Sequence, residues 1–186
     1  MVTACWISPS SPTRRRPLPR WIRPGRGCWP PLSDDWDDQL EGFESGWPAF
    51  FDVLRLYLEH FAGQRSASFV AMTSIDGDHL AVWKRMTREL QLAGADAGEQ
   101  RTTPGEPERL SGVIERIHQN AKQRFILMRL EAPAPGVALV GTYLAGERVN
   151  ASMSMYFYDD NAEVHATASQ HKWRGWLSER FGLQGQ

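Results

Sequence analysis

The segment Arg148-Val-Asn-Ala-Ser-Met-Ser-Met-Tyr-Phe-Tyr158 alternates between two kinds of side chain along its whole length. One set is apolar and contains Val149, Ala151, Met153, Met155 and Phe157. The other set carries polar atoms and contains Asn150, Ser152, Ser154, Tyr156 and Tyr158. Successive side chains of a β-strand point to opposite faces of its sheet. The segment is therefore predicted to be a strand with one buried face.

Four further segments resemble it in composition. Branched and aromatic residues, which favour strands, are frequent in residues 67–75, 110–118, 124–130 and 137–145. Short turn-forming segments that contain Asn, Pro or Gly separate the last four predicted strands. Because such short connections join antiparallel neighbours, the second half of the chain is predicted to form an antiparallel meander.

Two helices are predicted to accompany this sheet. Residues 161–180 form the longer one, which ends at Gly182 and has an inner side made of Trp173, Trp176, Leu177 and Phe181. The shorter one follows Asp78, a suitable cap, and ends before Gly94, with Leu80, Trp83, Thr87 and Leu90 on one face. Residues 94–108 are rich in Gly, Pro, Thr and Glu and are predicted to be a mobile loop.

A separate helix is predicted over residues 48–61. Ser45 can cap it, Pro48 suits its first turn, and Gly63 can end it. Its aromatic side is predicted to be buried and consists of Phe50 or Phe51, Leu54, Leu58 and Phe61. Two partners for this side remain open, namely residues 64–186 of the same chain or a second copy, so self-association through the helix is one expectation.

Two motifs resemble a known family. The predicted order of elements is similar to that of the START and Bet v 1-like (SRPBCC) superfamily: a strand, a helix, a meander and a closing helix, here with Trp173-Arg-Gly-Trp-Leu177. The motif Gly46-Trp-Pro-Ala-Phe-Phe51, with Leu54-Arg-Leu-Tyr-Leu-Glu-His-Phe61, resembles the closing helix of the branch named after the activator of the heat-shock protein 90 ATPase.

The resemblance implies a fold class and a domain organisation. The expected fold is α+β, with an antiparallel sheet wrapped on a long C-terminal helix, which is a reduced helix-grip. Residues 64–186 would form this START-like domain, and residues 34–63 would be the closing helix of a truncated first domain. The resemblance implies neither a chaperone partner nor an enzymatic activity, because fold does not fix function.

Residues 1–33 differ chemically from the rest of the chain. They contain six arginines, seven prolines and no acidic residue, which leaves 15 basic and 22 acidic residues elsewhere. We interpret this leader as disordered, since it has no helical or strand periodicity. Three origins stay open: a start-site or reading-frame artefact, a natural tail, or an arm that binds nucleic acid.

Composition narrows the function classes. A formal net charge of -1 argues against a general nucleic-acid binder, and no apolar run reaches the roughly 18 residues of a membrane-spanning helix. Both cysteines, Cys5 and Cys28, lie in the leader, which also lacks the apolar segment of a signal peptide. A cytoplasmic location without a membrane partner is therefore predicted.

The candidate ligand-binding residues are aromatic or sulfur-containing. Soft methionine and flat indole surfaces suit a hydrophobic small molecule, yet the same side chains can simply fill a core. Both interpretations remain open for the set Trp83, Tyr143, Met153, Met155, Phe157, Trp173 and Trp176.

The sequence contains no cluster of residues typical of catalysis, a metal site or a cofactor site. His165 and His171 are six residues apart and do not share a helix face, and Asp159, Asp160 and Glu163 suit the acidic first turn of a helix. The favoured function is non-catalytic binding of a hydrophobic small molecule, or regulation. The alternatives are an interaction module with a filled core and a cyclase-like or hydrolase-like enzyme, for which Tyr143 and His118 are the candidates.

Overall fold

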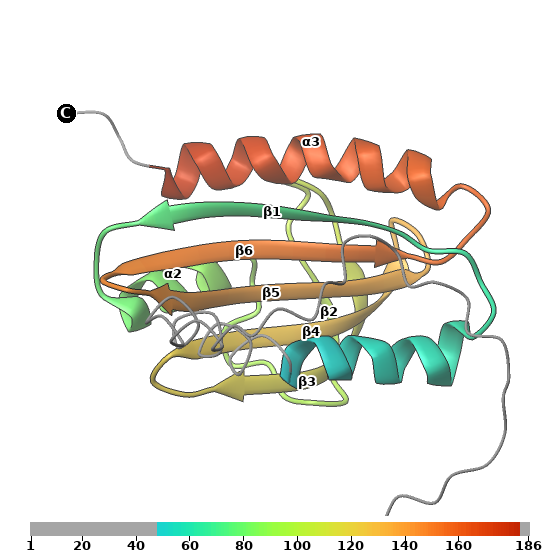
Figure 1. Cartoon of the computed structure of the whole chain (residues 1–186), viewed down its shortest axis with the longest axis horizontal. Coiled ribbons are helices and arrows are strands. Elements are labelled where there is room, and N and C mark those ends of the chain that lie inside the picture. The colour runs from blue at the N-terminus through green and yellow to red at the C-terminus, as the bar shows by residue number, and fades with distance from the viewer. Residues whose placement is uncertain (1–47, 183–186) are drawn as a thin grey trace, which may run out of the picture.

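The computed structural model describes residues 48–182, so the predicted leader and the start of the 34–63 segment lie outside the described residues. A six-stranded antiparallel sheet has the order β1-β6-β5-β4-β3-β2 (Figure 1). Its strands are β1 (Ala67–Ile75), β2 (Gln100–Thr102), β3 (Ser111–Gln119), β4 (Gln123–Ala132), β5 (Gly136–Ala145) and β6 (Arg148–Phe157). The helices are α2 (His79–Glu89), α3 (Ala162–Phe181) and a helix over residues 48–56 that continues as the π-helix η1 (Tyr57–Phe61). The predicted α+β class is confirmed.

The alternation of β6 determines how the sheet is buried. Its apolar set lies on one face, which α2 and α3 cover and which we call the inner face. The opposite face, called the outer face, carries the polar set of β6 together with Leu127 and Val137. The tight β5–β6 hairpin, in which Gly146 adopts a φ of 60°, keeps this register.

Helix α3 packs along β1 and β6 on the inner face (Figure 1). Its buried residues are small in the first half and large in the second: Ala162, Ala166 and Ser169, then Trp173, Trp176, Leu177 and Phe181. Small side chains let the first half approach the strands closely. The large side chains of the second half fill the space between helix and sheet, as the sequence predicts for the last four residues.

Helix α2 begins where predicted and ends earlier. The Asp78 carboxylate caps it by accepting a hydrogen bond from the Ala81 amide at 2.7 Å. Trp83 and Thr87 are buried as predicted, but Leu80 is exposed, and the buried face instead includes Val82 and Met86. The prediction for Leu80 was wrong because the buried stripe of α2 is turned around the helix axis toward His79, Val82 and Met86, away from Leu80.

The predicted mobile loop over residues 94–108 contains a strand. β2 pairs with β3 through the register Gln100↔Val113 to Thr102↔Ser111. Beyond it, the Thr103 hydroxyl accepts a hydrogen bond from the Leu110 amide at 2.8 Å. The loop prediction was wrong at this point, because three polar residues gain their strand geometry from pairing rather than from their own propensity.

The helix over residues 48–61 packs on the outer face of the sheet. Its buried residues are Ala49, Val53, Leu56 and Phe61, together with Asp52, and the last three apolar ones belong to a cluster with Leu127, Val137 and Tyr158. By contrast, Phe51 is 57% exposed and Leu58 is 61% exposed. The prediction that Phe50 or Phe51, Leu54 and Leu58 share the buried side with Phe61 was therefore wrong.

The π-helical geometry of η1 explains this difference. The predicted stripe assumed a period of 3.6 residues up to Phe61, but a π-helix forms hydrogen bonds from residue i to i+5 and so has a wider turn. The burial sequence Val53, Leu56, Phe61 contains a step of five residues across this turn. Because the helix has apolar residues on two sides, the extra residue in its last turn decides which side joins Phe61.

Candidate binding site

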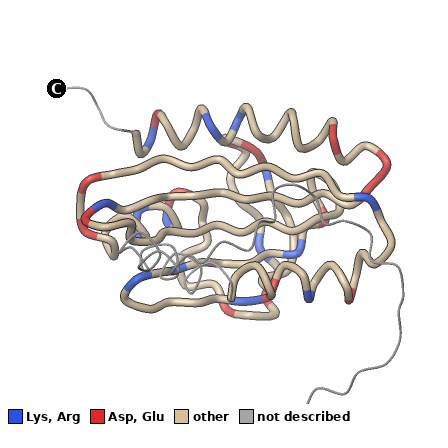
Figure 2. Tube along the Cα trace, viewed as in Figure 1, with Lys and Arg blue, Asp and Glu red and all other residues tan. Residues whose placement is uncertain are grey.

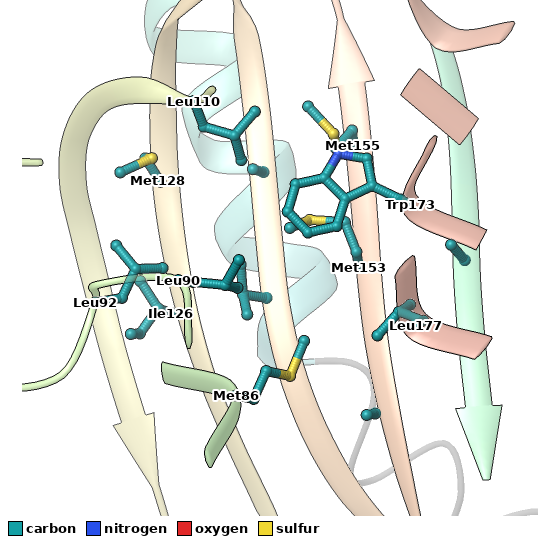
Figure 3. Close-up of a cluster of buried hydrophobic side chains, with 14 of the residues drawn as sticks. Met86, Leu90, Leu92, Leu110, Ile126, Met128, Met153, Met155, Trp173 and Leu177 are labelled. Atoms are coloured by element: carbon teal, nitrogen blue, oxygen red, sulfur yellow. The ribbon is translucent and has the colours of Figure 1, made fainter. Parts of the chain in front are cut away.

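The structure brings six of the seven candidate residues together on the inner face. Trp83 comes from α2, three residues come from β6 and two come from α3, and all of them belong to one buried cluster: Trp83, Met153, Met155, Phe157, Trp173 and Trp176. The Trp173 indole projects from α3 toward the middle of this cluster, beside Met153 and Met155 (Figure 3). The predicted residues thus converge, but their own side chains occupy the centre.

Several of the buried residues in this cluster are methionines. Met86 and Met128 join Met153 and Met155, so four thioethers belong to the same cluster as the Trp173 indole (Figure 3). Unbranched methionine side chains fill irregular space and adapt to changes in shape. The cluster is therefore a packed core made of adaptable side chains.

A buried carboxylate at the edge of this core was not found from the sequence. Glu108 accepts hydrogen bonds from Lys172 Nζ at 2.7 Å and from Trp173 Nε1 at 3.4 Å. It thereby joins the segment before β3 to α3 and satisfies the indole N–H. No local motif marks Glu108, because these partners lie 64 and 65 residues away in the sequence.

Tyr143 lies on the outer face, away from the other six candidate residues. Its hydroxyl donates to Sδ of Met72 at 2.8 Å, and burial raises its pKa. His118, the other residue considered for catalysis, stacks on Phe125 and contacts Asn120 through Nε2 at 3.0 Å. Neither side chain reaches the inner core, because both occupy outer-face positions of their strands.

Two other polar side chains, Asp159 and His79, have structural contacts. Asp159 accepts a hydrogen bond from the Asn161 amide at 2.9 Å and lies 3.4 Å from Nε2 of His165, so it supports the start of α3. The buried His79 ring links the start of α2 to Ala121 O and Thr142 Oγ1.

No group of three or more His, Cys, Asp or Glu residues suited to a metal ion occurs within residues 48–182. Within the same residues, no helix is long and apolar enough to cross a membrane.

A pocket of about 210 Å³ opens on the outer face between the 48–61 helix and β6. We call it the outer pocket, and its lining is almost entirely apolar and aromatic: Phe50, Val53, Leu54, Tyr57, Ser66, Tyr156 and Tyr158. Tyr156 and Tyr158 belong to the polar set that the alternation of the last strand predicts, but no local pattern combined them with the helix. The pocket exists because the helix packs beside these two tyrosines.

Stacked and tilted rings form one wall of the outer pocket. Tyr158 stacks on Phe61 with ring centroids 4.4 Å apart and lies 5.5 Å from the Tyr57 ring. The Tyr57 hydroxyl accepts a hydrogen bond from the Gly63 amide at 3.2 Å and so anchors the turn that leads to β1. These contacts fix the end of the helix that borders the pocket.

Burial keeps the phenols of Tyr156 and Tyr158 neutral at physiological pH. Burial raises the pKa of Tyr156. Burial, reinforced by the neighbouring Tyr156 and Tyr57, raises the pKa of Tyr158 to about 12. The phenols therefore keep their protons and can donate hydrogen bonds, and among the described residues no hydrogen bond uses either hydroxyl.

One ion pair ties the middle of the helix to the sheet. Asp52 lies on the buried side and accepts from Nη1 of Arg116 on β3 at 2.6 Å. Its second oxygen, Oδ2, is buried and has no hydrogen-bond partner within residues 48–182. Charged residues otherwise lie mainly on helices, in loops and toward strand ends, and the central parts of β1, β5 and β6 are uncharged (Figure 2). The Asp52–Arg116 pair thus orients the helix without placing a charge in the outer pocket.

Comparison with known proteins gives partial similarities to solved structures. DynU16, a putative protein of the dynemicin biosynthetic locus, is 14% identical over 59% of this chain and 43% of its own, with a TM-score of 0.41. CalU16 from Micromonospora echinospora is 14% identical over 66% of this chain and 83% of its own, with a TM-score of 0.44. A hypothetical protein from Helicobacter pylori is 12% identical over 64% of this chain and 89% of its own, with a TM-score of 0.42.

No protein-family model matches the chain, and no curated protein matches its sequence. The chain spans less than half of the length of DynU16. At these identities and TM-scores, the solved structures assign neither a family nor a function. The START-like resemblance of the sequence therefore stays a prediction, beside a confirmed antiparallel sheet with a long C-terminal helix.

Proposed function

We propose that this protein binds a small hydrophobic molecule in the outer pocket without transforming it. The observation that supports the proposal best is the pocket itself, an aromatic hollow beside a helix that leaves apolar surface open. Its volume of about 210 Å³ is below the range of roughly 300–1,000 Å³ for drug-sized ligands. The fitting ligand class is a single ring or a small fused ring, since an apolar cavity of about 150 Å³ holds benzene.

The chemistry of the lining supports binding rather than catalysis. Apart from the phenols and the Ser66 hydroxyl, the lining offers no group that transfers protons near neutral pH. The raised pKa of Tyr158 keeps its phenol in the donor form. A planar aromatic molecule with one hydrogen-bond acceptor matches this combination of rings and hydroxyls.

The inner cluster is a second candidate location, in line with the sequence-based prediction. Four methionines and three tryptophans there have the right character for a hydrophobic ligand. A ligand between the sheet and α3 would, however, have to displace the buried Trp173 indole, and the lost packing would oppose binding. The outer pocket needs no such rearrangement, which is why we favour it.

An interaction role through the same surface is the alternative function. Leu54 borders the pocket, and Leu58 next to it is exposed, so this helix could bind a second copy, which is the self-association expected from the sequence. The experiment on the pocket should therefore separate a small ligand from self-association.

The test uses indole and 2-naphthol as probes on the full chain. Ligand-observed NMR should show saturation transfer to each probe, with a dissociation constant in the micromolar to millimolar range. Ser66→Trp places a large ring in the pocket from an exposed position and should reduce probe binding at least tenfold. Arg65→Trp is the matched control, because the neighbouring residue is also exposed but does not line the pocket.

Three outcomes would contradict the proposal. The first is absence of saturation transfer with wild-type protein. The second is equal binding by both tryptophan variants. The third is loss of probe binding in Met155→Trp while Ser66→Trp binds normally, which would transfer the site to the inner cluster. If Leu58→Lys changes the mass of the protein in solution but not probe binding, self-association and ligand binding use different parts of the helix.

A further inference from the structure

Strand β1 lies at an edge of the described sheet and has unusual composition for that position. Its nine residues, Ala67–Ile75, include no charged residue and no proline, and it pairs only with β6 among the described strands. Natural proteins normally protect a long edge strand with charges, prolines, bulges or a covering helix, because its outer side presents unpaired backbone groups. Here α3 packs along β1, where Phe69 and Ala71 join the inner core, whereas Val70 and Met72 on the outer face stay exposed. Figure 2 shows β1 without a charged residue from end to end.

The opposite edge has the expected protection. β2 has only three residues, and one of them is Arg101, whose guanidinium pairs with Glu99 at 2.9 Å. The two edges of one sheet therefore differ in the feature that prevents strand pairing between molecules. By length and charge, β1 is therefore the better candidate of the two edges for the addition of another strand.

The sequence of β1 is nearly symmetric about Ala71. If a second β1 runs antiparallel with Ala71 opposite Ala71, residues at equal distances on either side of it lie opposite each other. The opposed pairs are then similar in character, apart from Phe69 with Thr73: Val70 with Met72, Ser68 with Ser74, and Ala67 with Ile75. Matched pairs on a shared face are the units that stabilise an antiparallel sheet.

We propose that β1 pairs antiparallel with β1 of a second copy and joins the two sheets into one. The partner is a second copy because the strand is complementary to itself, as a two-fold symmetric interface requires. Val70 and Met72 are 54% and 53% exposed on the outer face. In this register Val70 of each copy lies opposite Met72 of the other copy. Each apolar side chain thereby covers the other.

The strand ends are compatible with this register. Asp76, the first charged residue after β1, falls opposite position 66 of the second copy, which is a serine, so the pairing opposes no like charges. On the inner face, Phe69 and Ala71 are already buried against the core that α3 completes, so the exposed outer-face residues supply the newly buried surface. This interface does not require the outer pocket to bind a ligand.

The mass of the full chain in solution tests the pairing. Sedimentation velocity over a hundredfold range of concentration should show a species of twice the 21.1 kDa chain mass. Val70→Lys and Met72→Glu should each shift the protein to monomer, because each puts a charge into the paired outer face. Leu144→Lys is the control: this exposed apolar residue lies on β5, outside β1, and its variant should keep the wild-type mass.

Mixing the two charged variants tests the register. The lysine introduced at position 70 of one chain lies opposite the glutamate introduced at position 72 of the other. An equimolar mixture should therefore regain the dimer, while each variant alone remains a monomer. Circular dichroism of each variant verifies that it is folded.

Three results would overturn the proposal. A monomeric wild type over the full concentration range is the result expected if α3, which packs along β1, shields this edge. Folded charged variants that stay dimeric would show that association uses another surface. A mixture of the two variants that remains monomeric would contradict the register.

The outcome of the dimer experiment can be separated from the outcome of the pocket experiment. Loss of the dimer with unchanged indole binding would support both proposals, since Val70 and Met72 do not line the pocket. A dimer abolished by Leu58→Lys and retained in Val70→Lys would contradict pairing through β1 and assign association to the 48–61 helix instead.

Discussion

The two faces of the sheet are covered in different ways. On the inner face, α2 and α3 complete a continuous core in which Trp173 is fully buried. On the outer face, the 48–61 helix contributes a much smaller cluster around Leu56 and leaves the outer pocket and the apolar residues Val70 and Met72 accessible. The inner face therefore provides stability, and the outer face provides the surfaces at which binding can occur.

The largest effect is expected from the inner face. Trp173→Ala removes the central indole of the core and leaves the Glu108 carboxylate without one of its donors. We expect a loss of about 3–5 kcal/mol in the free energy of unfolding, measured by urea denaturation. Val164→Ala, at an exposed position of the same helix, should change it by less than about 0.5 kcal/mol. Similar values for the two variants would contradict a packed inner core.

A smaller effect is expected from the outer cluster. Leu56→Ala should cost about 2–3 kcal/mol, because Leu56 is fully buried between the helix and the sheet. Leu58→Ala should cost less than about 0.5 kcal/mol, since Leu58 is exposed two residues further on. Urea denaturation of this pair measures directly which side of the helix is buried. A larger cost for Leu58→Ala would restore the side that the sequence pattern predicted.

The smallest effect concerns pH and the outer pocket. In the folded protein the pKa of Tyr158 is about 12, against about 10 for an unfolded chain, so the buried neutral phenol favours folding below about pH 10. This contribution is lost as the pH rises from about 10 to about 12, and partial screening by solvent limits it to at most about 2 kcal/mol. Tyr158→Phe should remove this part of the pH dependence, measured as the difference in unfolding free energy between variant and wild type across that range. Parallel pH profiles would show that Tyr158 is not shielded as described.

The inner face was largely predictable because its residues follow regular periods. The alternation in β6 placed Met153 and Met155 correctly, and the spacing in α3 placed Trp173 and Trp176. The Asp78 cap was also predictable, because a capping carboxylate acts within the first turn of its own helix. Local patterns with one buried side determine their own orientation once a core forms.

The outer face was not predictable from the same reasoning. The 48–61 helix has apolar residues on two sides, so its periodicity did not select Leu56 over Leu58. Tyr143 is a candidate for the inner cavity because of its polar hydroxyl, although its place in β5 directs it to the opposite face. The polar strand β2 left no pattern, because pairing with β3 determines its geometry.

Three features follow from the order of amino acids alone: the α+β class, the β3–β6 meander, and the apolar side of the last strand and helix. They depend on periods of two and 3.6 residues within continuous segments. Three other features required the folded chain: the place where the 48–61 helix packs, the contact of Glu108 with Lys172, and the pocket that Tyr156 and Tyr158 border. These features join residues that are distant in the sequence. Their energies depend on packing between segments, and such contacts leave no period in the chain that a local pattern can report.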